Sequence, residues 1–196
     1  MTALDEYPSP APAARARLIE QLTEHALIIG TVTLTSGAVA EYYVDAKRAI
    51  LRPAGFAALA ELVAAHVDLW GGTAVGGLTM GADPVACAAL AGGSSAKAFF
   101  VRKDAKAHGL QRRIEGPVLE PGERCVIVED VVTTGGSTLA AIEAVTGAGH
   151  EICGVISVLD RLAGGGAAIE RAAGAPYVAL STIDEVYPAR PDRPAA

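Results

Sequence analysis

The chain has 196 residues, a formal net charge of −6 and a hydrophobic fraction of 51%. Its length fits one α/β domain with a substantial core. The acidic balance argues against general nucleic-acid binding, which needs a basic surface. The apolar runs are far shorter than the roughly 20 residues of a membrane span. We therefore expect one soluble domain over residues 1–196, with flexible ends at residues 1–12 and 188–196.

The N-terminus and the cysteines indicate a reducing compartment. The first 12 residues lack a basic stretch followed by an apolar one, so they do not resemble a signal peptide. The three cysteines, Cys87, Cys125 and Cys153, are odd in number, lie in apolar segments and lack C-x-x-C spacing. This pattern argues against a disulfide framework and a zinc site. We expect core thiols in a cytoplasmic protein.

The first part of the chain predicts a small set of helices and strands. The expected elements are a helix over 13–29, short strands over 32–34 and 42–44, and a helix over 53–69. Gly30 is the predicted stop of the first helix. Pro53 suits the first position of the second helix, because a helix N-terminus does not need its missing N–H.

From residue 73 onward, strands and helices alternate. The expected strands cover 73–75, 98–101, 125–128, 152–159 and 177–180, and the expected helices cover 84–91 and 139–148. Alternation of short, continuously apolar strands with helices predicts an α/β fold with a mostly parallel sheet flanked by helices. Ligands bind beyond the carboxyl ends of the strands in such sheets. A capping box at Ser181–Asp184 predicts a last short helix.

The segment Val126–Thr138 carries the strongest functional signal. An apolar strand is followed by Glu129 and Asp130, then by a Thr/Gly/Ser loop before an Ala-rich helix. Backbone N–H groups of the loop and of the first helical turn suit a phosphate, while the two carboxylates suit ribose hydroxyls. No nucleoside-triphosphate loop or G-x-G-x-x-G is present. The alternative is an ordinary strand-to-helix turn.

A second polar segment, residues 102–116, lies between two apolar strands. It contains five of the 16 Lys and Arg residues, which are Arg102, Lys103, Lys106, Arg112 and Arg113. Long loops of this kind are often functional lids. Cations in a lid that closes over a bound anion stabilise that anion while closure excludes water. The alternative is a solvated charged loop.

These motifs resemble those of known enzymes. Val126–Thr138 resembles the ribose-phosphate signature of type I phosphoribosyltransferases. Arg102–Gly109 resembles the R-K-x-x-K-x-H-G loop of orotate phosphoribosyltransferases. Further similarity lies at Thr33–Gly37, at Tyr42–Asp45 and at Val158–Arg161, so the resemblance spans about residues 15–165.

The resemblance implies a type I phosphoribosyltransferase fold with a small N-terminal hood. It implies transfer of ribose 5-phosphate from 5-phosphoribosyl 1-diphosphate to orotate in pyrimidine biosynthesis, giving orotidine 5′-monophosphate and diphosphate. Mg²⁺ is expected to bind through the donor and water, with no direct protein ligand. A homodimer is also implied, with the lid and its Lys103 reaching the neighbouring subunit's site. The alternatives are a purine phosphoribosyltransferase and a non-catalytic sensor of the donor that acts on nucleic acid.

The resemblance also assigns residue roles. The implied catalytic residues are Lys106, His108 and Asp130. The implied donor-binding residues are Arg102, Lys103, Lys106, His108, Glu129, Asp130, Val131, Val132, Thr133, Thr134, Gly135, Gly136 and Ser137. The implied orotate-binding residues are Thr133, Arg161, Tyr42 and Tyr43. A planar guanidinium such as that of Arg161 can grip a carboxylate through two parallel hydrogen bonds. The alternatives are a local Arg161–Asp160 pair and, for the tyrosines, core packing.

Two positions depart from the family pattern. Thr35 and Met80 stand where lysines are common in the motifs that the chain resembles. Two cations expected near the substrates are therefore missing. Lys47 and Arg48 are nearby candidates to replace them, and the sequence alone does not place either one.

Overall fold

The computed structural model describes residues 9–33, 39–103 and 113–193. Its centre is a six-stranded sheet in the order β5-β4-β3-β6-β7-β8. The strands are β3 (Ala74–Leu78), β4 (Lys97–Val101), β5 (Ile114–Glu115), β6 (Arg124–Val132), β7 (Glu151–Asp160) and β8 (Tyr177–Ala179). Adjacent strands are parallel, except that β5 runs antiparallel to β4. The predicted mostly parallel α/β fold is confirmed.

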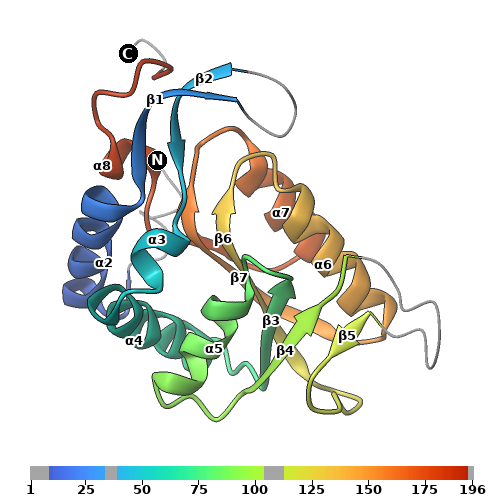
Figure 1. Ribbon diagram of the computed structural model, residues 1–196. Coiled ribbons are helices and arrows are strands. Elements are labelled where there is room, and N and C mark those ends of the chain that lie inside the picture. The colour runs from blue at the N-terminus through green and yellow to red at the C-terminus, as the bar shows by residue number, and fades with distance from the viewer. Residues whose placement is uncertain (1–8, 34–38, 104–112, 194–196) are drawn as a thin grey trace.

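Helices cover both faces of this sheet (Figure 1). One face packs against α4 (Pro53–Leu69) and α5 (Asp83–Ala91), and α2 (Pro12–His25) packs on α4. The other face packs against α6 (Gly136–Gly147) and α7 (Gly165–Ala173). Successive side chains of a strand point to opposite faces, so β6 supplies both cores. Val126 and Val128 enter the first core, while Cys125 and Ile127 enter the second.

A separate antiparallel hairpin of β1 (Leu27–Thr33) and β2 (Val39–Val44) lies above one end of the sheet (Figure 1). The predicted helix over 13–29 is therefore too long, because α2 ends at His25. Residues 27–29 are apolar and partly β-branched, and they pair with 42–44 instead of extending the helix. Gly30, the expected helix stop, lies inside β1 with a φ of 137°, beside a register shift of the hairpin.

Other boundaries also differ from the prediction. β6 continues to Val132, so Glu129 and Asp130 lie within the strand's last residues and not beyond its end. The capping box of α8 (Ile183–Val186) uses Thr182 and Glu185, one residue later than predicted. Three short elements were not predicted, namely α3 (Lys47–Ile50), β5 and α7. Cys125 and Cys153 are buried as expected, but Cys87 is exposed.

The segment after α8 turns back onto the molecule. Arg190 is only 8% exposed, and its guanidinium pairs with Asp184 at 2.7 Å and with Asp192 at 2.9 Å. These ion pairs fix Arg190 and Asp192 against α8, although the sequence predicts a flexible end over residues 188–196. Among the described helices, none is long and apolar enough to cross a membrane.

Candidate active site

The carboxyl end of β6 presents two adjacent buried carboxylates. Glu129 accepts a hydrogen bond from the Thr138 hydroxyl at 3.4 Å, and one oxygen of Asp130 accepts the N–H of Val131 at 2.8 Å. Burial, reinforced by the neighbouring Asp130, raises the pKa of Glu129 to about 8. The pair is therefore a preformed acceptor site, fixed by the sheet, with less than its full negative charge at neutral pH.

The turn from β6 into α6 forms an anion-sized hollow of about 230 Å³ beside Glu129. Its lining includes Thr133, Thr134, Gly135, Gly136, Ser137 and Thr138. Gly135 has a φ of 85°, and a Cβ there would meet the Ile169 side chain at 3.1 Å. In the described structure no side chain caps the first turn of α6. Its N–H groups are left to bind an anion such as a phosphate.

The turn after β3 closes against the acidic pair. A Cβ at Gly81 would collide with one Asp130 carboxylate oxygen and approach Glu129 Oε1 to 3.0 Å. Glycine at this position therefore lets the backbone lie directly on the two carboxylates. Met80, where a lysine was expected, is 77% exposed.

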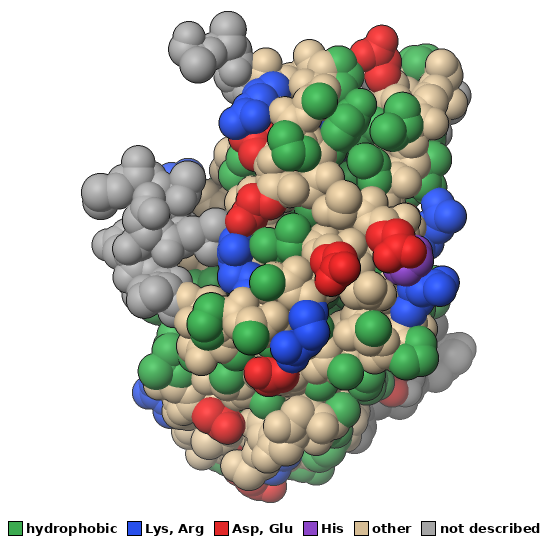
Figure 2. Space-filling view, turned by 90° about the vertical axis from the view of Figure 1, so that its left-hand side faces the viewer, with side chains coloured by type: hydrophobic (Ala, Val, Ile, Leu, Met, Phe, Trp, Pro, Cys, Tyr) green, Lys and Arg blue, Asp and Glu red, His purple; other side chains and the backbone are tan. Residues whose placement is uncertain are grey.

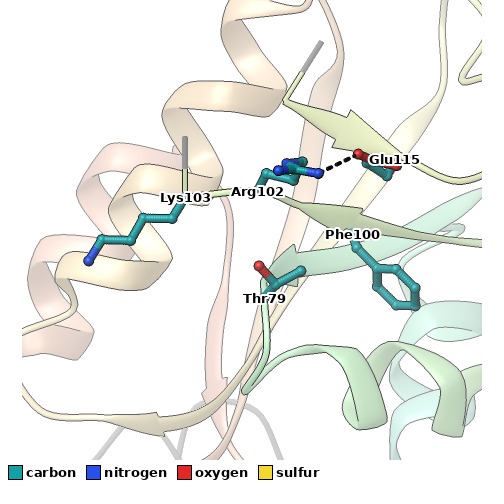
Figure 3. Close-up of a pocket in the computed structure, with 5 residues that line it drawn as sticks. All are labelled: Thr79, Phe100, Arg102, Lys103 and Glu115. Atoms are coloured by element: carbon teal, nitrogen blue, oxygen red, sulfur yellow. Dashed lines mark hydrogen bonds and ion pairs between the residues drawn. The ribbon is translucent and has the colours of Figure 1, made fainter. Parts of the chain in front are cut away.

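A second cleft, of about 400 Å³, lies at the base of the predicted lid. Figure 3 shows its five lining residues, which are Thr79, Phe100, Arg102, Lys103 and Glu115. Arg102 pairs with Glu115 at 3.2 Å, and the Lys103 side chain points away from that pair. The backbone N–H of Arg102 donates to the Arg113 carbonyl at 2.8 Å, so the chain segments at the two ends of the predicted lid are held together. Lys106 and His108 lie outside the described residues.

Arg161 and Tyr42 meet near the carboxyl ends of β6 and β7. The Arg161 guanidinium carbon lies 5.0 Å from the centre of the Tyr42 ring. The backbone N–H of Arg161 donates to the Val132 carbonyl at 2.8 Å, which places Arg161 next to the start of the loop that lines the anion-sized hollow. Tyr43 is exposed, and as the next residue of β2 it points to the opposite face of the hairpin. The structure thus brings Tyr42 but not Tyr43 to Arg161.

Asp160 does not serve as the partner of Arg161. Its two carboxylate oxygens accept hydrogen bonds from the Leu162 N–H at 2.7 Å and from the Tyr177 hydroxyl at 2.9 Å. Arg161 instead faces Asp192, whose Oδ2 lies 3.9 Å from Nη2 of Arg161. The local pair that the sequence left open is replaced by a contact with the C-terminal segment.

Asp192 was not singled out from the sequence. Its carboxylate accepts the Tyr42 hydroxyl at 2.9 Å and the Arg190 guanidinium at the same distance. Partial burial acts to raise the pKa of this carboxyl, but the hydrogen bonds from Arg190 and Tyr42 outweigh it and lower that pKa. An ionised carboxylate therefore faces the guanidinium of Arg161.

The structure also places the two cations that the sequence could not place. The Lys47 amine lies 2.8 Å from Asp130 and 3.1 Å from Asp45, whereas Arg48 is exposed. Burial acts to lower the pKa of Lys47, but the two carboxylates outweigh it and raise that pKa. Lys47 is thus a fixed positive charge at the acidic pair.

Comparison with known proteins supports one family. Residues 50–171 match the family model of the phosphoribosyl transferase domain. The orotate phosphoribosyltransferase of Streptomyces coelicolor is 47% identical, over 88% of this chain and 96% of that protein. The crystal structure of Mycobacterium tuberculosis H37Rv orotate phosphoribosyltransferase has a TM-score of 0.80 and 43% identity, covering 89% of this chain and 99% of that one. This chain belongs to the orotate phosphoribosyltransferase family.

A further structure of the Mycobacterium tuberculosis enzyme is described as a complex with 5-phospho-α-D-ribosyl 1-diphosphate. It has a TM-score of 0.75 and 38% identity, covering 88% of this chain and 98% of that one.

Magnesium, which the family implies, fits this site only in part. No group of three or more His, Cys, Asp or Glu side chains in the described residues is placed to hold a metal ion. Of the acidic pair, Asp130 already contacts the Lys47 amine and Glu129 is buried. Such a donor set suits an ion that brings most of its oxygen ligands with it, on a diphosphate and in water.

Charged side chains of both signs are mixed on one face of the molecule (Figure 2). Figure 2 shows the face on the left-hand side of Figure 1, where Lys and Arg side chains are interspersed with Asp and Glu. Among the described residues visible there, no continuous basic surface is present. A protein that binds nucleic acid needs such a surface to replace counterions around phosphates.

Proposed function

We propose that this chain transfers ribose 5-phosphate from 5-phosphoribosyl 1-diphosphate to N1 of orotate. The single observation that supports this best is that the acidic pair adjoins the anion hollow, while Arg161 is held by its backbone N–H at Val132, where the same loop begins. The carboxyl ends of β6 and β7 are adjacent, so both substrates would meet at one edge of the sheet.

The donor would bind along the end of β6. The backbone N–H groups of residues 133–137 would take its 5-phosphate, and Glu129 with Asp130 would accept hydrogen bonds from its ribose hydroxyls. As the bond from the sugar's anomeric carbon to diphosphate breaks, positive charge develops on the ribose ring. The carboxylate of Asp130, already fixed at this site, would stabilise that transition state.

Orotate would bind between the hairpin and the end of β7. The guanidinium of Arg161 would take its carboxylate through two parallel hydrogen bonds, and Thr133 would contact the same base. The Tyr42 ring already lies under this guanidinium, so it would fix the plane in which the carboxylate binds.

The lid would supply cations to the departing diphosphate. Arg102 and Lys103 lie at its base, and Lys106 with His108 would reach the diphosphate on closure. We also propose a homodimer in which Lys103 serves the neighbouring subunit's site. Mg²⁺ would bind through the donor's phosphate oxygens and neutralise charge on the leaving group. A cytoplasmic location stays a prediction from the sequence.

The test is the loss of orotate absorbance when the protein is mixed with orotate, the donor and Mg²⁺. We expect turnover that requires all three components, and no comparable use of adenine, guanine or hypoxanthine as acceptors. Turnover of a purine base in place of orotate would reverse the proposal in favour of a purine phosphoribosyltransferase. No turnover, with tight binding of RNA or DNA, would favour a regulator.

A further inference from the structure

Lys47 is held at the acidic pair by contacts from two parts of the fold. Its amine lies 2.8 Å from Asp130 Oδ2 and 3.1 Å from Asp45 Oδ1. Asp45 also accepts the backbone N–H of Lys47 at 3.2 Å, and its own N–H donates to the Ala26 carbonyl at 3.0 Å. The end of the hairpin and the end of α2 therefore fix where this amine lies.

The contact determines how the Asp130 carboxylate is oriented. One oxygen accepts the Val131 N–H at 2.8 Å, and the other accepts the Lys47 amine at the same distance. A carboxylate has about four acceptor positions, so about two remain for other donors. Those remaining positions are what a vicinal pair of ribose hydroxyls requires.

We infer that Lys47 is a positioning residue for the sugar of the donor, an inference that rests on the proposed function. Lys47 orients Asp130 through one hydrogen bond and balances its charge, so that Asp130 receives ribose hydroxyls in a fixed geometry. It remains in contact with Asp130 while the donor is bound. Among the described residues, it is the cation in contact with the acidic pair.

A purely structural role accounts less well for this arrangement. The Lys47 side chain is 39% exposed, and ion pairs at such exposure add little to stability. The partner of Lys47 is, moreover, a buried carboxylate, where a missing cation leaves a buried negative charge uncompensated. Removing Lys47 should therefore change ligand binding at the acidic pair more than it changes the free energy of unfolding.

The experiment compares Lys47→Met, Lys47→Arg and the matched control Arg48→Met. Arg48 is the next residue and is exposed, so its substitution removes the same charge without touching Asp130. Lys47→Met should lower kcat/KM for the donor by about 10- to 100-fold, the effect typical of losing a hydrogen bond to a charged group. The KM for orotate should stay within about twofold of wild type, and Lys47→Arg should recover much of the loss.

Two results would overturn the inference. One is a donor kcat/KM for Lys47→Met within about twofold of wild type. The other is an equal loss for both substrates with no recovery in Lys47→Arg, which indicates a general structural defect. If Lys47→Met does not fold, Lys47→Gln serves instead, because it keeps a hydrogen-bond donor but removes the charge.

Titration with ribose 5-phosphate separates this inference from the proposed function. It needs neither orotate nor turnover, and isothermal calorimetry measures it directly. If wild type does not consume orotate, the proposed function is wrong, but the inference about Lys47 is still tested by the calorimetry. Binding weakened at least about tenfold in Lys47→Met but not in Arg48→Met supports the inference, and equal binding in both overturns it.

Discussion

The two ends of the site are built in different ways. The hollow and the acidic pair of the proposed donor end come from one contiguous segment, residues 129–138, against which Gly81 and Lys47 lie. The acceptor end joins Tyr42, Arg161 and Asp192, which lie far apart along the chain. A site made by a continuous backbone tolerates few local changes, whereas one made by distant side chains can be altered one contact at a time.

The largest effect should come from Gly81→Ala, which tests how strictly the backbone defines the donor end. A methyl group there would overlap the Asp130 carboxylate, and a shift of about 1 Å at a catalytic group can cost about 100-fold in rate. We expect about that loss in turnover. Gly147→Ala is the control, because nothing lies within 4 Å of its new Cβ. Normal turnover in Gly81→Ala would contradict the account of the donor end.

Arg161→Ala tests the acceptor end through its central side chain. Losing a charge-assisted hydrogen bond costs about 1.5–3 kcal/mol, so the KM for orotate should rise by about 10- to 100-fold. The KM for the donor should hardly change, because the phosphate hollow is intact. Arg171→Ala, at an exposed position of α7, is the control in the same steady-state assay. An unaltered KM for orotate would refute the assignment of Arg161.

A smaller effect is expected from Asp192→Ala. Its carboxylate and that of orotate would compete for Arg161, and a partly exposed ion pair is worth about 0.2–1 kcal/mol. The KM for orotate should therefore fall by about two- to fivefold. Asp192→Asn removes the charge but keeps a hydrogen-bond acceptor for Tyr42, so the KM for orotate should fall nearly as far in this variant. If the KM rose in both variants, Asp192 would be a support of the orotate site and not its competitor.

The last prediction concerns stability and pH, and it sharpens the account of the donor end. Because burial raises the pKa of Glu129, the unfolded chain loses this proton at a lower pH than the folded protein does. As the pH rises from the unfolded pKa of about 4.3 to the folded value, the free energy of unfolding of wild type should therefore fall relative to that of Glu129→Gln, by up to about 1.4 kcal/mol per pH unit. Denaturant unfolding of both ligand-free proteins at a series of pH values measures this difference. A difference that does not change with pH would show that Glu129 is ionised when folded.

The sequence predicted the strand, carboxylates, loop and helix of residues 126–138 well, because their determinants are local. Two carboxylates, a Gly-containing loop and a helix follow one another within Val126–Thr138, so the backbone brings them together without help from the rest of the chain. The helix that begins at Pro53 was predicted for the same reason. The exact end of β6 was missed, because Glu129 and Asp130 continue an extended backbone that their polarity does not reveal.

Contacts between distant parts of the chain were not predictable from the sequence. Tyr42 and Asp192 are 150 positions apart, and Lys47 and Asp130 are 83 apart, so neither contact leaves a periodic pattern in the sequence. Residues 27–29 fit a helix and a strand equally well by local pattern, and pairing with β2 decides between them. These choices depend on tertiary contacts, which a single sequence does not specify.

A crystal structure with orotidine 5′-monophosphate tests the central claim most directly. The account predicts ribose hydroxyls on Glu129 and Asp130, the 5-phosphate against the backbone of residues 133–137, and the base carboxylate on Arg161. Nucleotide density at any other place in the molecule, with the acidic pair left uncontacted, would contradict it.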